Sequence, residues 1–122
     1  METPSQSPAD ELSQHGLDLL AEGRALEAAR EFRAAIDADF NHVEAHHGLV
    51  RALRDAGRFE ASIAIALKLA VLTPDDPLAH TALSISLQHG GHVTEAEAAA
   101  ARARVLEWKI ALQSPPEEDA KP

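Results

Sequence analysis

Residues 53–57 read LRDAG, and a leucine followed four places later by a glycine also occurs in LLAEG at 19–23 and in LQHGG at 87–91. The leucines and the glycines therefore recur at a constant interval of 34 residues. An internal repeat of this length is typical of stacked helical hairpins, none of which can bury its apolar face alone. The repeat predicts an all-α protein built as a solenoid of helix-turn-helix units.

The glycines of these stretches predict where helices end. Glycine adopts the backbone conformation of a helix C-terminal cap at little cost, so each unit divides at its glycine into a first and a second helix. Three units, 9–42, 43–76 and 77–110, therefore predict six helices. Small residues keep the same interval five places after each glycine, where two helices must approach closely: Ala28, Ser62 and Ala96.

Polar residues predict where some of the helices begin. Asn41 and Asp76 stand at the expected N-caps of the next first helices, because their side chains can accept hydrogen bonds from the free N–H groups of a first turn. Thr94 and Glu97 have the spacing of a capping box, which predicts the start of the last helix. Residues 94–113 contain no helix breaker, so this helix is expected to be extended, to about residue 113.

The composition excludes several classes of function. Hydrophobic residues make up 45% of the chain, and with three Phe, one Trp and no Tyr the core must consist mainly of Ala and Leu. A formal net charge of −9 argues against binding of nucleic acid, which needs clustered Lys and Arg. The absence of Cys excludes a disulfide framework and a thiolate nucleophile. Arg outnumbers Lys and Ala is abundant, which is typical of GC-rich bacterial genomes.

Both ends of the chain lack the apolar periodicity. Residues 1–8 are polar and contain two prolines, and residues 114–122 form an acidic, proline-rich tail. Neither segment can bury enough apolar surface to offset the entropy of ordering, so both are expected to be disordered on either side of a domain at 9–113. The N-terminus has no apolar run typical of a signal peptide or a transmembrane segment, which predicts a cytoplasmic protein with no membrane partner.

The sequence resembles the tetratricopeptide repeat (TPR) family, whose 34-residue pattern places Leu, small and aromatic residues at fixed positions. His46 and His80 stand where the family usually has Trp, and Phe40 and Trp108 stand where Pro is common. The resemblance implies a superhelix of helix pairs that acts as a non-catalytic protein-protein interaction module. The matching residues lie between 9 and 110: Leu12, Gly16, Leu19, Ala28, Phe32 and Ala35 in the first unit, Leu49, Leu53, Gly57, Phe59 and Pro74 in the second, and Leu83, Leu87, Gly91, Ala96 and Ala103 in the third.

In this family the first helices line a concave groove that binds a peptide or protein segment. The family positions that face the ligand imply these groove residues: Ser13, Leu17, Leu20, His47, Arg51, Arg54, Leu78, Thr81, Ile85, Gln88 and His89. Because Arg can bind a carboxylate through two parallel hydrogen bonds, Arg51 and Arg54 predict a partner that bears an acidic group. The alternative is that both arginines are solvated and pair with Asp55 or Glu44.

The last helix carries two apolar stripes at helical spacing. The first is expected to pack on the preceding helix: Ala96, Ala99, Ala103, Leu106 and Ile110. The second lies roughly opposite: Ala98, Ala101, Val105, Trp108 and Leu112. Because exposed apolar area costs about 25 cal/mol per Å², the second stripe predicts a homodimer surface or a partner-binding edge, and self-assembly is the alternative function. The other interpretation is that the alanines are surface helix formers and that Trp108 folds back onto the array.

Seven histidines raise the further alternative of a metal site. They gather near two junctions, at His42, His46 and His47, and at His89 and His92. Zinc needs three or four convergent ligands, and adjacent side chains on a helix point about 100° apart, so metal binding is the least favoured alternative. The sequence has no Ser-His-Asp arrangement, phosphate-binding glycine loop or HExxH motif, and it predicts neither an enzyme nor a cofactor.

Overall fold

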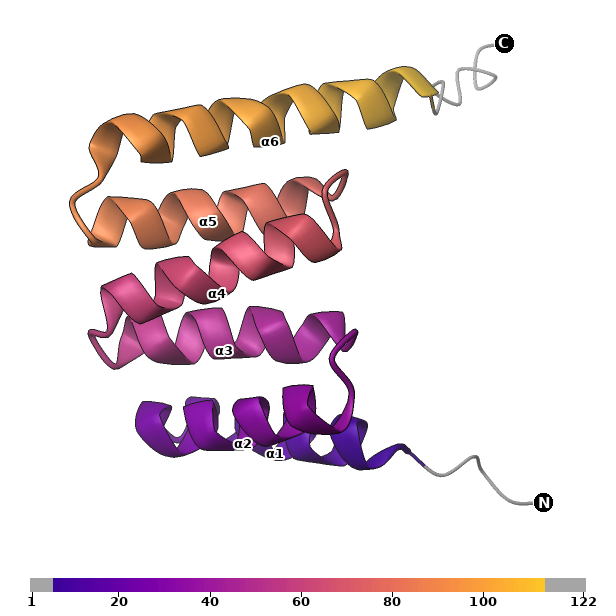
Figure 1. The fold of residues 1–122 in the computed structure, drawn as a ribbon, viewed down its shortest axis with the longest axis vertical. Coiled ribbons are helices and arrows are strands. Elements are labelled where there is room, and N and C mark those ends of the chain that lie inside the picture. Colours follow the sequence, from indigo (N-terminus) through magenta and orange to yellow (C-terminus); the bar gives the residue numbers. More distant parts are fainter. Residues whose placement is uncertain (1–5, 114–122) are drawn as a thin grey trace, which may run out of the picture.

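The computed structural model describes residues 6–113, which form six α-helices (Figure 1). Their bounds are α1 (Pro8–Ala21), α2 (Ala25–Ala38), α3 (Val43–Asp55), α4 (Phe59–Leu72), α5 (Pro77–His89) and α6 (Val93–Gln113). The prediction of an all-α array of three helix-turn-helix units with an extended last helix is confirmed, since α6 has 21 residues. The segments expected to be disordered at 1–5 and 114–122 lie outside the described residues.

The first helices of the three hairpins form a continuous layer. Each helix contacts the next one in the chain, and α3 also contacts α1 and α5. Within residues 6–113 no such contact joins α2 to α4, so the second helices lie further apart than the first helices. The core between the first helices and the second helices consists mainly of buried Ala and Leu, as the composition predicted. Among the described helices none is both long and apolar enough to cross a membrane.

The three repeated glycines form the turns inside the hairpins. Gly23, Gly57 and Gly91 have φ of 79°, 77° and 85°, a left-handed conformation that residues with a Cβ rarely adopt. In each turn the N–H of the residue after the glycine donates to the carbonyl of the repeated leucine, at 2.9, 2.8 and 2.8 Å. This hydrogen bond belongs to the Schellman motif, which satisfies carbonyls at the end of a helix. The repeated leucine and glycine are therefore two parts of one turn.

The helix starts agree only in part with the predicted ones. Asp76 caps α5 as expected, and its side chain accepts a hydrogen bond from the N–H two residues later at 2.9 Å. Asn41 does not cap α3. Its N–H donates to the Asp39 carboxylate, and the N-cap is His42, whose Nδ1 accepts the Ala45 N–H at 3.1 Å. The ring nitrogen of His42 therefore caps α3, whereas the sequence predicted a cap by the side-chain oxygen of Asn41, one residue earlier.

The first and last helices each begin earlier than predicted. Ser7 caps α1 in a capping box with Asp10, so Ser7 and Pro8 belong to the start of this helix and not to a disordered segment. Helix α6 begins at Val93, so Thr94 lies within the first turn and does not cap it. The N–H of Ala96 already donates to the carbonyl of His92 at 2.9 Å, which moves the helix start ahead of the predicted capping box.

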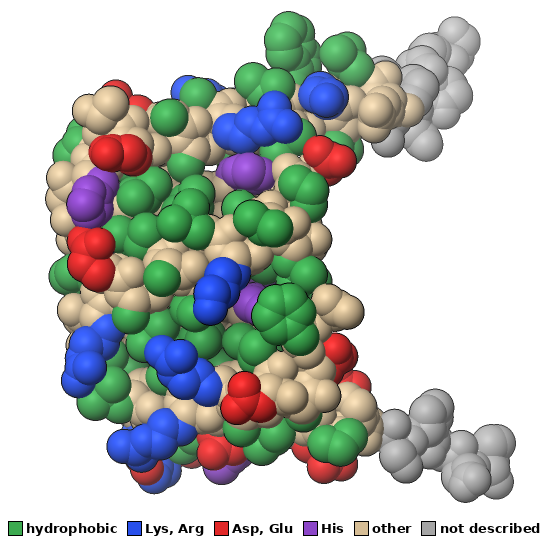
Figure 2. Space-filling model, viewed as in Figure 1, with side chains coloured by type: hydrophobic (Ala, Val, Ile, Leu, Met, Phe, Trp, Pro, Cys, Tyr) green, Lys and Arg blue, Asp and Glu red, His purple; other side chains and the backbone are tan. Residues whose placement is uncertain are grey.

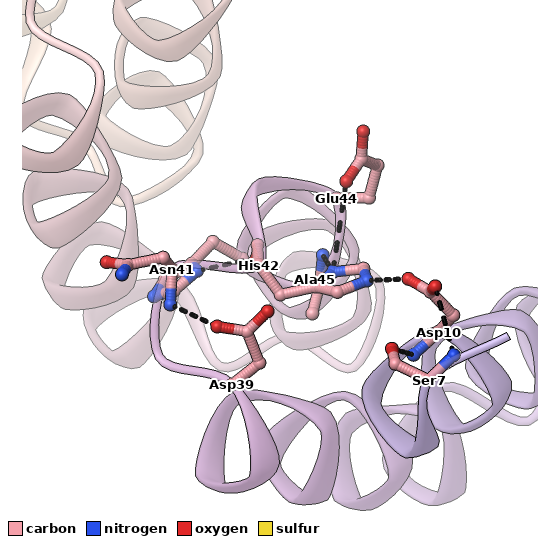
Figure 3. Close-up of polar contacts among 8 residues, drawn as sticks. Ser7, Asp10, Asp39, Asn41, His42, Glu44 and Ala45 are labelled. Atoms are coloured by element: carbon pink, nitrogen blue, oxygen red, sulfur yellow. Dashed lines mark hydrogen bonds and ion pairs between the residues drawn. The ribbon is translucent and has the colours of Figure 1, made fainter.

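Hydrogen bonds between histidine and a carboxylate join the starts of alternate helices. Nε2 of His42 lies 2.6 Å from Oδ1 of Asp10, which ties α3 to α1 (Figure 3). Because Nδ1 of His42 accepts the bond that caps α3, the proton of the neutral ring is on Nε2 and is donated to the carboxylate. This hydrogen bond is the main cause of the lowered pKa of Asp10. His92 and Glu60 join α6 to α4 in the same way at 2.8 Å, and this bond raises the pKa of His92.

Phe32 is fully buried between the first and second hairpins, where two glycines make room for its ring. A Cβ at Gly16 of α1 would lie 2.8 Å from the ring, and a Cβ at Gly48 of α3 would overlap it. Gly16 and Phe32 are among the residues that resemble the TPR pattern, whereas Gly48 is not. The close packing of α2 on α1 and α3 therefore depends on a glycine that the repeat did not identify.

The repeated small residues lie where helices approach closely, as predicted. Ala28, Ser62 and Ala96 are all buried. Ser62 Oγ donates to the carbonyl of Val50 at 3.0 Å and lies 2.6 Å from Oγ of Ser86. Because the single Ser62 proton is used for the carbonyl, Ser86 donates to Ser62. These two bonds satisfy the buried hydroxyl groups and join α4 to α3 and α5.

Candidate functional site

A hollow of about 310 Å³ lies between the first helices α3 and α5. We call it the α3–α5 groove. It is lined by His47, Val50, Arg51, Arg54, Leu78, Thr81, Ala82 and Ile85. The two helices present these residues because the side chains recur every three or four positions on one face of each helix. The groove therefore combines four apolar side chains with two guanidinium groups.

The structure brings together six of the eleven predicted groove residues. They are His47, Arg51, Arg54, Leu78, Thr81 and Ile85. The sequence analysis missed Val50 and Ala82, which lie in the same hollow. Helical spacing could have found both, since Val50 is three residues after His47 and Ala82 is four residues after Leu78.

The other five predicted residues lie outside this groove, and the first of them cannot contact a ligand. Ser13 is 4% exposed, because it shares the packed face of α1 with Ala9 and Gly16, four residues before it and three after it. Leu17 is exposed and Leu20 is half-buried on the same helix. Gln88 and His89 are exposed at the end of α5, where the His89 ring lies beside Phe59 at a centroid distance of 5.6 Å.

The charges of the groove are only partly neutralised. Arg51 Nε lies 3.7 Å from Oδ2 of Asp55, and both side chains are largely exposed, so this pair is loose. Arg54 is half-buried and has no carboxylate within 4.0 Å among the described residues. Burial lowers the pKa of Arg54, against the opposite effect of Asp55, yet arginine stays charged in proteins. A poorly hydrated guanidinium group is thus left open to an acidic ligand.

His47 lies half-buried beside the two arginines. Burial lowers its pKa, while Asp76 and Glu44 act in the opposite direction. The lowered pKa favours the neutral ring at pH 7, in which one nitrogen donates and the other accepts a hydrogen bond. The groove can therefore offer apolar contact, a neutral hydrogen-bonding group and positive charge to the same ligand.

The histidines do not converge on a common point. His42 and His92 are hydrogen-bonded to carboxylates on different helices, and Nδ1 of His46 donates to the carbonyl of His42 at 2.9 Å. Among the residues that the structure describes, no three His, Asp or Glu side chains are placed to hold a metal ion. The contacts of these rings are those of helix caps and helix-to-helix bonds, which gives the metal alternative no support.

The second stripe of α6 is exposed in the single chain. Val105, Trp108 and Leu112 are 43%, 67% and 69% exposed, so Trp108 does not fold back onto the array. Ile110 was expected to pack on the preceding helix but is 46% exposed. The reason is visible in Figure 1, where α6 continues past the start of α5 and leaves the end of its inner stripe without a neighbour.

Comparisons with known proteins agree on the fold. A family model for the tetratricopeptide repeat matches residues 19–86, which is more than half of the chain. Among solved structures, PcrH in complex with the chaperone-binding region of PopB is similar at 18% identity and a TM-score of 0.80, over 93% of this chain and 92% of that one. No match to a curated protein sequence was found.

Two further structures are similar over most of this chain. The type III secretion chaperone SycD of Yersinia enterocolitica, in complex with a peptide of the translocator YopD, has 22% identity and a TM-score of 0.78, over 94% of this chain and 84% of that one. The second TPR of Spaghetti, bound to an HSP90 peptide, has 16% identity and a TM-score of 0.76, over 82% of this chain and 93% of that one. At these identities the likeness shows the fold alone.

Proposed function

Because the chain belongs to the tetratricopeptide repeat family, we propose that it binds an acidic, partly apolar peptide segment in the α3–α5 groove. The family consists of non-catalytic protein-interaction modules, and membership agrees with the prediction that this chain is not an enzyme. PcrH, SycD and the Spaghetti domain are each described with a bound protein segment or peptide. These complexes support peptide binding as the use of the fold, while the chemistry of the ligand is argued from this groove.

The observation that carries the proposal is the position of Arg54. Its guanidinium group is half-buried against apolar groove residues and has no carboxylate partner among residues 6–113. Water solvates such a group poorly, so a ligand carboxylate that replaces the water gains a charge-assisted hydrogen bond. Leu78 is 63% exposed and Ile85 is 36% exposed beside it, and these side chains supply apolar contact for the rest of the segment.

Reversing both groove charges is expected to abolish this binding. Peptides are selected from a phage-displayed library of random 12-residue sequences on the wild-type protein, and those that perturb the groove residue Ile85 are kept. These peptides should bind the Arg51→Glu/Arg54→Glu variant at least about 100-fold more weakly, since each charged hydrogen bond contributes about 1.5–3 kcal/mol. Titration calorimetry gives both dissociation constants.

Arg30→Glu is the matched control, because Arg30 is exposed on α2 and does not line the groove. It should leave the affinity within about twofold, since exposed charges far from a site contribute little. Equal affinities for the wild type and the Arg51→Glu/Arg54→Glu variant would contradict the proposal.

A second function, self-association through the outer stripe of α6, is supported by its exposure. Val105, Trp108 and Leu112 follow one another at spacings of three and four residues along the helix, and all three are exposed. This spacing places them on one face, which a second helix can cover. SycD is described as a dimer in one of the similar structures, at 20% identity. We therefore propose that two copies meet along this stripe.

Trp108→Glu is expected to convert a dimer into a folded monomer. A charge placed at 67% exposure costs the monomer little, but in a helix-to-helix contact it would be desolvated without a partner. Light scattering should show a halved mass and circular dichroism an unchanged helix content. Leu26→Glu, at an exposed leucine of α2, is the control that should keep the dimer mass. The same mass for the wild type and Trp108→Glu would rule out this role of the stripe.

A further inference from the structure

A second hollow in the array is larger than the α3–α5 groove. A cleft of about 540 Å³ lies between the second helices α2 and α4, with α3 beneath it. We call it the α2–α4 cleft. It opens on the face of the array shown in Figure 2, because α2 and α4 do not contact each other. Its volume lies in the range of about 300–1,000 Å³ that is usual for ligand pockets.

The cleft is apolar inside and continues onto three exposed apolar side chains, which we call the apolar ridge: Phe40, Leu67 and Val71. Ile36, Leu49 and Ile65 line its interior. At its edge a second hollow of about 430 Å³ shares Phe40 and Lys68 with the cleft and extends along α4 over Leu67 and Val71. Phe40 is 62% exposed, Leu67 51% and Val71 81%. Cleft and ridge together form an apolar surface long enough for several residues of an extended or helical segment.

His46 places one polar atom in this apolar surface. The ring is 2% exposed and its Nδ1–H donates to the carbonyl of His42, so in the neutral ring Nε2 is an acceptor. Nε2 makes no hydrogen bond within the described residues, and since no fully buried side-chain nitrogen is left without a partner there, Nε2 is not completely enclosed. The His46 side chain lines the cleft. Phe40 packs edge-on against the His46 ring, and the two ring centroids are 5.7 Å apart.

The charges at the rim favour an acidic occupant. Arg33 and Lys68 line the cleft together with a single acid, Asp37. Neither cation has a carboxylate within 4.0 Å among residues 6–113, although the whole chain has a net charge of −9. Figure 2 shows Lys and Arg side chains set among the hydrophobic ones on this face. In a strongly acidic protein, two unpaired cations beside an exposed apolar surface match a ligand of opposite charge.

A second copy docking through the outer stripe of α6 is a poor match for this cleft. The half of α6 that carries Val105, Trp108 and Leu112 also carries Arg102, Arg104 and Lys109 against the single acid Glu107. Docking this half against Arg33 and Lys68 would bring like charges together, which is unfavourable at an interface.

We propose that the α2–α4 cleft is a second binding site, for an acidic partner segment that places a large apolar side chain in the cleft. Carboxylates of the segment pair with Arg33 and Lys68, and an N–H or O–H donor meets Nε2 of His46. Apolar side chains that follow lie over Phe40 and Val71. The site uses different side chains of α3 from the groove, since His46 faces the cleft and its neighbour His47 faces the groove.

The five isoleucines allow one experiment to report on each surface separately. Ile36 and Ile65 line the cleft, Ile85 lines the groove, Ile110 lies on α6 and Ile63 is buried near Gly90. Protein labelled only at the Ile δ1 methyl groups is titrated with peptides selected from the random 12-residue phage library. We expect a class of peptides that shifts the Ile36 and Ile65 methyl signals, leaves Ile85 unshifted, and contains Asp or Glu next to a large apolar residue.

Charge-reversal variants then test the recognition. Arg33→Glu/Lys68→Glu should weaken binding of this class at least about tenfold, whereas Arg30→Glu on the same helix and Arg51→Glu/Arg54→Glu in the groove should leave it unchanged. The proposal is overturned when no selected peptide shifts Ile36 and Ile65, or when those that do bind equally well after Asp and Glu are replaced by Asn and Gln. Failure of the groove proposal would appear instead at Ile85, so the two can be told apart.

Discussion

Phe32→Ala is expected to destabilise the protein by about 3–5 kcal/mol, the range for removal of a buried Phe side chain. Its ring is fully buried and fills the space between Gly16 and Gly48, so the helices cannot close the cavity without shifting α2 against both neighbours. Total stabilities of small domains are about 5–15 kcal/mol, and the variant should therefore unfold at far lower urea concentration. Urea denaturation followed by circular dichroism measures the change.

Phe40→Ala provides the matched control for this prediction. It deletes the same atoms, but the Phe40 side chain is 62% exposed. The loss should be about 1 kcal/mol or less, since surface substitutions away from such packing usually change stability little. Similar losses for the two variants would show that the first and second hairpins are not held together by the Phe32 ring.

Gly48→Ala is expected to destabilise the protein by about 1–3 kcal/mol, although alanine is the better helix former by about 1 kcal/mol. The added Cβ would overlap the Phe32 ring, which is fully buried between α1 and α3. The same urea measurement applies, and a gain in stability would contradict this account of the packing.

A double variant isolates the contact. In Gly48→Ala/Phe32→Leu the smaller side chain leaves room for the new methyl group, so the combined loss should be smaller than the sum of the single losses by about 1 kcal/mol. Strict additivity would mean that Gly48→Ala acts through the backbone and not through the Phe32 ring.

The lining of the α3–α5 groove could be predicted in part from the sequence. The resemblance to the family implied Arg51, Arg54, Leu78 and Ile85, and the structure places all four in one hollow, because a repeat fixes which face of each first helix points the same way. The resemblance also implied Ser13 as a groove residue, and this prediction was wrong, because the face of α1 that carries Ser13 is packed into the core. The position of a residue in the repeat gives its direction on an ideal array, but how the first unit packs on the second decides what is exposed.

The α2–α4 cleft could not be predicted from the sequence, for a related reason. The sequence singled out Phe40 only as a departure from the family pattern, and His46 only as such a departure and as a possible metal ligand. It gave no signal at Arg33 or Lys68. These residues come from three helices and from the loop between α2 and α3, and they surround one space only because α2 and α4 do not touch. No spacing within a single helix predicts the distance between two others.

The sequence by itself determined the helices and the turns between them. The repeated leucine and glycine close a turn through hydrogen bonds that span five residues, so local backbone chemistry suffices, as it does for the cap at Asp76. The tertiary structure alone decided that His42, the N-cap of α3, also bonds Asp10, and that Gly48 admits the Phe32 ring. These contacts join residues 16 to 32 positions apart, and their energy depends on how whole helices pack.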